Sequence, residues 1–169
     1  MSVDALERYR KTLAESVVFA RLLPAELDLV MASCRLIDVD AGEMLLSEGH
    51  KGSGLYIILE GDIEVFLPER SVAGVRRPSR VRLNVLGPGR CLGEYGVIDD
   101  QPSSASAQAL RASRVSLLAT ADFRRIVDQH DHIAAIVHAN LLRFLVSRLR
   151  NKDKELDVIL FVEERESAG

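Results

Sequence analysis

The sequence predicts a mainly β protein whose strands form an antiparallel sandwich or roll, with helices before and after it. Three observations support this fold class. Residues 34–119 consist of short apolar runs separated by glycines at nearly regular intervals, which is typical of antiparallel β folds. The segments between those runs have no helical pattern, so a βαβ arrangement does not fit. Apolar residues at helical spacing instead mark residues 1–33 and 120–162.

Residues 1–33 are predicted to form N-terminal helices. Leu6, Tyr9, Leu13 and Val17 recur at helical spacing, starting near residue 3. The pattern breaks just before Pro24, which suits the first turn of a second helix because proline needs no amide partner there. We therefore expect two consecutive helices before the first strand.

Residues 34–119 are predicted to form the β region. The strands expected from apolar runs and alternation are residues 36–39, 44–46, 55–59, 63–67, 81–85 and 115–118. Residues 68–78 are expected to be an exposed hairpin loop. Residues 70–90 contain six arginines and no acid, so this stretch is either a solvated basic loop or a surface for an anion or partner. The arginine spacing alone does not decide between them.

Residues 120–162 are predicted to be helical, with a break at residues 129–131. The second helix is expected from about residue 132 to 161, a length of about 45 Å. Because it carries two apolar stripes, we expect one face to pack on the β region and the other on a partner helix, which gives a homodimer. The alternative is a helix that folds back on its own domain. Residues 163–169 are expected to be a polar, frayed tail.

Composition excludes several classes of function. The chain has 169 residues, 47% of them apolar, and a net charge of −3, which is typical of a globular protein and gives no reason to expect a nucleic acid or membrane partner. Cys34 and Cys91 lack the spacing of a metal site or a disulfide framework, which favours a reducing, cytoplasmic setting. The sequence has no P-loop, dinucleotide-binding or nucleophile motif and no zinc-type histidine pair. We therefore do not expect an enzyme, a metal or a permanently bound cofactor.

The candidate site is the segment of residues 91–109. A turn led by Gly93 and followed by a short helix presents free backbone N–H groups, which suit an anion such as a phosphate. Glu94 can accept a hydrogen bond from a hydroxyl group such as that of a sugar. The segment contains no arginine or lysine, so it lacks a fixed positive charge.

The order of these features resembles the cyclic nucleotide-binding domain family, over roughly residues 18–161. The similar segments are a turn at Gly42 before a strand ending at Glu48 and Gly49, the run of residues 54–61, and residues 87–96 with Pro102 beyond them. The resemblance implies an eight-stranded antiparallel roll, similar to a jelly roll, flanked by helices, with a long last helix that commonly dimerises. It also implies a ligand-binding set of Leu83, Gly93, Glu94, Tyr95, Ser103, Ser104, Ala105 and Ser106.

In this family an arginine near the end of the segment pairs with the cyclic phosphate, and the position that matches it is Ser103. Losing one partner of a buried charge pair costs about 2–5 kcal/mol, roughly 30-fold to several thousand-fold in affinity. Arg82, Arg90 and Arg111 are the nearest arginines in sequence that could substitute.

Three functions remain open. The first is a regulatory module that binds cAMP, cGMP or another cyclic nucleotide with weakened or altered affinity. The second is a non-binding structural or dimerisation module. The third is the ligand-sensing part of a transcription regulator without its DNA-binding domain. A further, unidentified protein partner is compatible with each.

Overall fold

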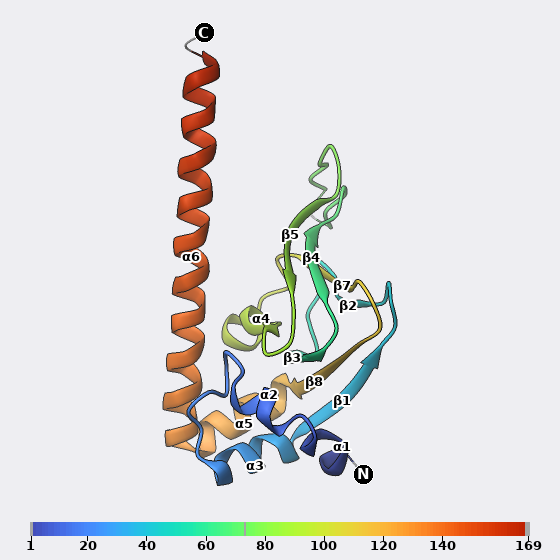
Figure 1. The fold of residues 1–169 in the computed structure, drawn as a ribbon, viewed down its shortest axis with the longest axis vertical. Coiled ribbons are helices and arrows are strands. Elements are labelled where there is room, and N and C mark those ends of the chain that lie inside the picture. Colours follow the sequence, from blue (N-terminus) through green and yellow to red (C-terminus); the bar gives the residue numbers. More distant parts are fainter. Residues whose placement is uncertain (1, 73, 168–169) are drawn as a thin grey trace.

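The computed structural model describes the backbone of residues 2–72 and 74–167, and the side chains within residues 5–72 and 74–154. Two four-stranded antiparallel sheets form a roll. Helices from both sides of the β region in sequence gather at one end of the roll, and a long C-terminal helix runs past its side (Figure 1).

The eight-stranded antiparallel roll is confirmed. One sheet has the order β1-β8-β3-β6 and the other β2-β7-β4-β5. The short strands β6 and β7 were not predicted individually from apolar runs. The strands are β1 (Cys34–Val39), β2 (Met44–Leu46), β3 (Gly54–Glu60), β4 (Ile63–Leu67), β5 (Val81–Leu86), β6 (Cys91–Leu92), β7 (Ser106–Ala109) and β8 (Ser113–Ala119).

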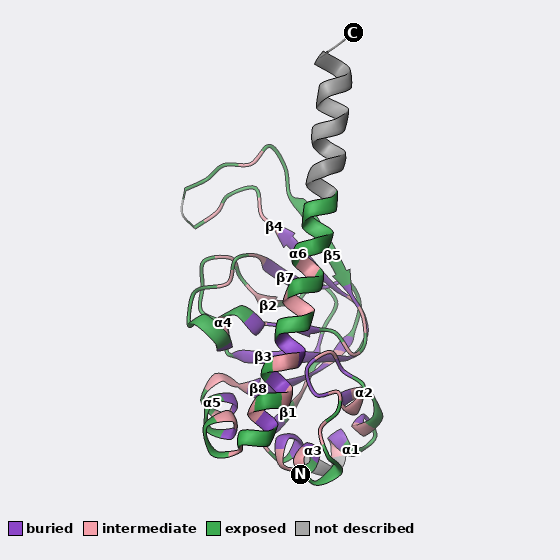
Figure 2. Cartoon of the chain, turned by 90° about the vertical axis from the view of Figure 1, so that its left-hand side faces the viewer, coloured by how far each residue is buried: buried purple, intermediate pink, exposed green. Residues whose placement is uncertain are grey.

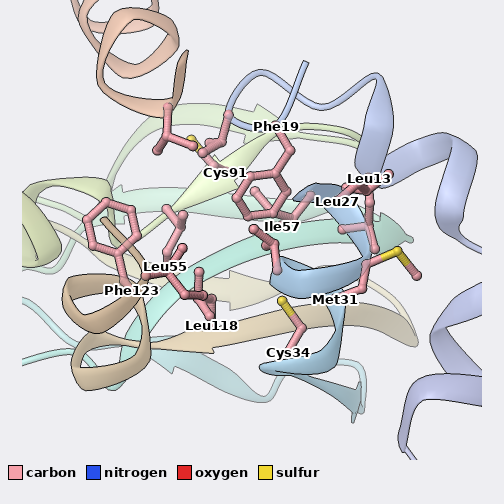
Figure 3. Close-up of a cluster of buried hydrophobic side chains, with 14 of the residues drawn as sticks. Leu13, Phe19, Leu27, Met31, Cys34, Leu55, Ile57, Cys91, Leu118 and Phe123 are labelled. Atoms are coloured by element: carbon pink, nitrogen blue, oxygen red, sulfur yellow. The ribbon is translucent and has the colours of Figure 1, made fainter. Parts of the chain in front are cut away.

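Strand β3 is buried on both faces, which explains its continuous apolar run. Leu55 and Ile57 point toward the helices, in the same cluster as Phe19 and Phe123 (Figure 3). Ile58 belongs to a second cluster, between the two sheets. Successive side chains of a strand point to opposite faces, so one strand supplies both parts of the core.

The N-terminal prediction was partly wrong. The helices are α1 (Ser2–Glu7), α2 (Arg10–Ala14) and α3 (Pro24–Ala32), and residues 15–23 are not helical. Ser16 explains the interruption, because its hydroxyl donates to the carbonyl of Leu13 (2.7 Å) and accepts from the amide of Phe19 (3.1 Å). Such local side-chain bonds compete with helix formation. Pro24 does occupy the first turn of α3, as predicted.

Residues 68–80 connect β4 to β5 as a hairpin, which confirms the expected exposed loop. Several of its arginines have acidic partners on neighbouring elements. Arg77 bonds Glu48 at 2.8 Å, and Arg80 and Arg82 share the buried Glu64. Much of the positive charge predicted for this region is therefore balanced locally.

The C-terminal helices are α5 (Thr120–Gln129) and α6 (Asp131–Ser167), which confirms the predicted break between them. The first half of α6 packs on its own domain through Ile133, Val137 and Leu141. Further along, the exposed fraction of the helix surface rises (Figure 2).

The polar tail expected at residues 163–169 is not what the structure has, because α6 continues to Ser167. Residues 163–167 contain no glycine or proline, and glutamate and arginine are good helix formers. Residues 168–169 lie outside the described residues. At 37 residues, α6 is roughly 55 Å long.

Candidate ligand-binding site

A cavity of about 460 Å³, counting its open mouth, lies between the roll and α6. Most of its wall is apolar and comes from both sheets, and its polar groups come from the segment that follows β6 and from α6. The lining residues are Leu46, Val65, Leu86, Leu92, Gly93, Glu94, Tyr95, Gly96, Ser103, Ser104, Ala105, Ser106, Ala107 and Arg148.

Gly93 makes the turn that directs the chain from β6 into the short helix α4 (Glu94–Asp99). Its φ is +77°, a conformation that favours glycine. A β-carbon at this position would lie 2.2 Å from the carbonyl oxygen of Gly54 in the neighbouring strand. Backbone approach and backbone angle therefore both require glycine here, and the turn places Glu94 at the cavity.

Glu94 is buried, with 5% of its side chain exposed, and it forms an ion pair with Arg148 of α6. Nη1 of Arg148 donates to Oε1 of Glu94 at 2.5 Å. Burial raises the pKa of the Glu94 carboxyl, and the neighbouring guanidinium opposes that rise. The pair joins two segments that lie 54 residues apart in sequence.

Aromatic rings surround the same guanidinium. Its central carbon lies 5.4 Å from the ring centre of Tyr95 and 5.6 Å from that of Phe144. Both distances are within the range of cation–π attraction. The Arg148 side chain is 37% exposed, so it reaches the cavity from the solvent side.

Backbone hydrogen bonds hold the closing segment, residues 103–106, against the turn after β2. The amide of Ser103 donates to the carbonyl of His50 (2.9 Å), and the amide of Gly49 donates to the carbonyl of Ser103 (2.8 Å). The hydroxyl of Ser106 accepts from the amide of Glu48 at 3.0 Å. Because this hydroxyl already has a partner, the side chains of Ser103 and Ser104 are the more available ones.

Asp100 anchors the end of α4. Its carboxylate accepts from Lys51 (3.1 Å) and pairs with Arg124 of α5 (3.2 Å). The Lys51 hydrogen bond, followed by that of Arg124, lowers the pKa of Asp100. This carboxylate therefore links the cavity wall to α5 and to the turn before β3.

The structure gathers seven of the eight residues predicted for the ligand site around this cavity, namely Gly93, Glu94, Tyr95, Ser103, Ser104, Ala105 and Ser106. It does not bring Leu83 there, because this residue lies on the edge strand β5 with 36% of its surface exposed. None of the three arginines nearest in sequence lines the cavity. Arg82 pairs with Glu64, Arg111 pairs with Asp62 at 2.5 Å, and Arg90 is exposed.

Arg148 is the charged cavity residue that sequence reasoning missed. The other lining residues that were not predicted are apolar or small, namely Leu46, Val65, Leu86, Leu92, Gly96 and Ala107. A signal for Arg148 was present in the apolar stripe of α6 that contains Val137, Leu141 and Phe144. Continuing that stripe by four residues reaches Arg148, so a charged residue stands at the next position of the inward face. Its partner 54 residues earlier could not be read from the spacing.

Other kinds of site find little support in the part of the chain that the structure describes. No group of three or more acidic, histidine or cysteine side chains there is arranged to hold a metal ion. Cys34 and Cys91 are buried, and burial raises the pKa of the Cys34 thiol to about 11 and that of Cys91 further, which makes both poor nucleophiles. Within the same residues, no helix has the length and apolarity needed to cross a bilayer.

Comparison with known families identifies the fold. The profile of the cyclic nucleotide-binding domain matches residues 36–130, more than half of the chain. The chain belongs to the cyclic nucleotide-binding domain family. The match includes β2 to β8, α4 and α5, and so contains every cavity residue except Arg148.

Curated relatives of this cyclic nucleotide-binding domain include a cyclic AMP receptor protein, regulatory subunits of cAMP-dependent protein kinase and potassium channels. The Cyclic AMP receptor protein of Thermus thermophilus is 30% identical over 150 residues, which are 89% of this chain and 65% of that protein. A cAMP-dependent protein kinase regulatory subunit of Emericella nidulans is 27% identical over 125 residues, 74% of this chain and 28% of that protein. The chain thus spans less than two thirds of the length of either relative.

Solved structures agree on the fold. The crystal structure of the Thermus thermophilus Catabolite Activator Protein superimposes with a TM-score of 0.70 at 29% identity, covering 86% of this chain and 64% of that one. A cyclic nucleotide-binding domain from Methylobacillus flagellatus gives a TM-score of 0.78 at 21% identity, covering 89% and 83%. This second likeness supports the roll and its helices rather than any ligand.

Proposed function

We propose that this chain is a regulatory, non-catalytic module that binds a cyclic nucleotide with weakened or altered affinity. The observation that carries the proposal is the cavity itself, in which Gly93, Glu94 and residues 103–106 converge from separate parts of the fold. The buried carboxylate of Glu94 suits a ligand hydroxyl, and the apolar walls suit a planar base. Names of the relatives, such as Cyclic AMP receptor protein, favour cAMP as the first ligand to test.

Weakened affinity is inferred from Ser103. A serine at the rim of the cavity offers a hydroxyl but no charge to a phosphate, and the arginines nearest in sequence do not line the cavity. The loss of one member of a charge pair corresponds to about 2–5 kcal/mol. We therefore expect affinity roughly 30-fold to several thousand-fold below that of a site with an arginine at this position.

Calorimetric titration tests the function directly. We expect cAMP, cGMP or a cyclic dinucleotide to give a saturable heat of binding, with a matching rise in Tm because a ligand that binds the folded state stabilises it. Adenosine is the control that has the base and sugar but no phosphate. The absence of heat and of any Tm shift with all the cyclic nucleotides at millimolar concentration would rule out the binding function.

The second candidate is a non-binding structural or dimerisation module. The uncharged Ser103 favours it, as does the pairing of Glu94 with a residue of the protein itself. Ser103→Arg separates the two candidates. If the site has lost its ligand through this residue, the variant should gain cyclic-nucleotide binding by at least about 30-fold. Ser79→Arg, at an exposed serine of the hairpin between β4 and β5 that does not line the cavity, is the matched control. Equal binding by the parent and by Ser103→Arg would show that Ser103 is not the weak point.

We also propose that the chain forms a homodimer through α6. Leu142, Val146 and Leu149 share one face of this helix and are 63%, 41% and 62% exposed. Residues three and four apart lie side by side on a helix, so these form an apolar stripe without a partner in the single chain.

The buried Cys34 and Cys91 thiols are compatible with the reducing, cytoplasmic setting that we infer. Relatives that regulate transcription favour the role of a ligand sensor within such a protein.

A further inference from the structure

Arg148 and Glu94 are the two charged side chains among the described residues that line the cavity. They neutralise each other at 2.5 Å, so the side chains that line the cavity have no net charge. A phosphate that enters must therefore find its counter-charge in a group that is already paired. The identity of that group decides which part of the fold responds to the ligand.

The two partners are not equivalent. Glu94 is buried at 5% exposure, whereas Arg148 reaches in from the mouth with 37% of its side chain exposed. A guanidinium has five N–H donors, and within the described residues one of these makes a hydrogen bond, to Glu94. The remaining N–H groups can donate to an oxyanion, and a fork of donors suits phosphate.

We propose that Arg148 is the anion receptor of this cavity and supplies, from α6, the positive charge that Ser103 does not. When the ligand binds, its phosphate replaces the Glu94 carboxylate as the partner of the Arg148 guanidinium. Glu94 then accepts a hydrogen bond from a ligand hydroxyl. This proposal rests on the proposed function for the identity of the ligand. The new element is that Arg148 of α6, and not a residue of the closing segment 103–106, binds the negative charge of the ligand.

Removing Arg148 and neutralising Glu94 should have opposite effects on the binding of an anion. Without Arg148, the cavity retains an unpaired, buried carboxylate, which repels an anion. With Glu94 neutralised, the guanidinium is unpaired and available. The first half of α6 is fixed on the domain through Ile133 and Val137, and Arg148 lies beyond it. Ligand binding at Arg148 therefore also acts on the orientation of the exposed half of the helix. Coupling of this kind is reciprocal, so if the ligand stabilises one orientation of α6 by some factor, holding α6 in that orientation raises the affinity for the ligand by the same factor.

The test uses calorimetry on the full chain with two probes, cAMP and inorganic phosphate. Arg148→Met preserves side-chain length without the charge, Arg148→Lys restores a charge without the fork, and Glu94→Gln frees the guanidinium. Arg150→Met is the matched control, because Arg150 is an exposed arginine on the same helix. Thermal unfolding of each variant verifies that it is folded.

We expect Arg148→Met to weaken cAMP binding by about tenfold to a hundredfold, the value of one charged hydrogen bond. Arg148→Lys should recover part of that loss, and Arg150→Met should bind as the parent does. Glu94→Gln should bind inorganic phosphate more tightly than the parent. The double variant, Glu94→Gln with Arg148→Met, should lose this gain.

The outcomes separate the two proposals. Equal cAMP affinity of the parent and Arg148→Met would overturn the anion receptor and leave the nucleotide-binding function standing. A gain of phosphate binding in Glu94→Gln that depends on Arg148, without cAMP binding by any variant, would support the receptor and overturn the nucleotide function. Binding of neither probe by the parent or by Glu94→Gln would overturn both.

Discussion

Replacing Gly93 with alanine tests whether the cavity wall has the close backbone approach described above. The residue has a φ of +77°, and the added β-carbon would lie 2.2 Å from the carbonyl oxygen of Gly54, whereas real β-carbons essentially never come within 3.0 Å of such an atom. The left-handed conformation costs a non-glycine residue about 1–2 kcal/mol. Relief of the overlap adds about 1–3 kcal/mol, which is typical of overpacking.

Gly74 provides a control that separates these two costs. Its φ is +81°, close to that of Gly93, but a β-carbon there would meet nothing within 4 Å. Gly74→Ala should therefore lose only the conformational part. The difference between the variants, about 1–3 kcal/mol, corresponds to roughly 2–12 °C in Tm for a protein of this size.

Differential scanning calorimetry of the parent, Gly74→Ala and Gly93→Ala measures this difference. We expect the lowest Tm for Gly93→Ala and an intermediate one for Gly74→Ala. Equal Tm values for the two variants would refute the reasoning, because they would mean that β3 does not restrict the space beside Gly93.

The remaining predictions concern the rest of the fold. Arg82 and Arg80 lower the pKa of Glu64 in the folded state, so its stabilising effect is present above the unfolded pKa and lost as pH falls through the folded value. Glu64→Gln should therefore flatten the fall of Tm below about pH 5, and an unchanged acid slope would contradict this. The double variant Leu142→Glu and Leu149→Glu should be monomeric in sedimentation velocity while retaining the parent's circular dichroism. A sedimentation coefficient equal to that of the parent would show that this face of α6 does not hold a dimer. Buried thiols with raised pKa should react slowly with a disulfide reagent at pH 8 until the chain unfolds, and fast reaction of both in the folded protein would contradict their burial.

The roll was predictable because its signals are local. The uninterrupted apolar run at residues 55–59 predicted a strand, and the structure has one apolar cluster on each side of it. Glycines at turns marked strand ends, and Pro24 marked the start of α3. In each case a few neighbouring residues contain the information.

The errors arose where a distant or very specific contact decides the structure. Hydrogen bonds of the Ser16 hydroxyl interrupt a helix whose apolar spacing looked continuous. Strand β6 has two residues and exists because it pairs with Tyr56 and Ile57 of β3. The Glu94–Arg148 pair forms only if α6 is positioned along its axis so that Arg148 lies beside the cavity, and this position depends on the packing of the whole domain.

The most direct test of the central claim is a titration of the isotope-labelled chain with cAMP, followed by NMR of the backbone amides and of the Arg148 side chain. We predict saturable shifts at residues 93–96 and 103–106 and at the Arg148 Nε resonance, because the ligand occupies the cavity that these groups line. Shifts confined to other surfaces, or no shifts at millimolar cAMP, would contradict the assignment of this cavity as a cyclic-nucleotide site.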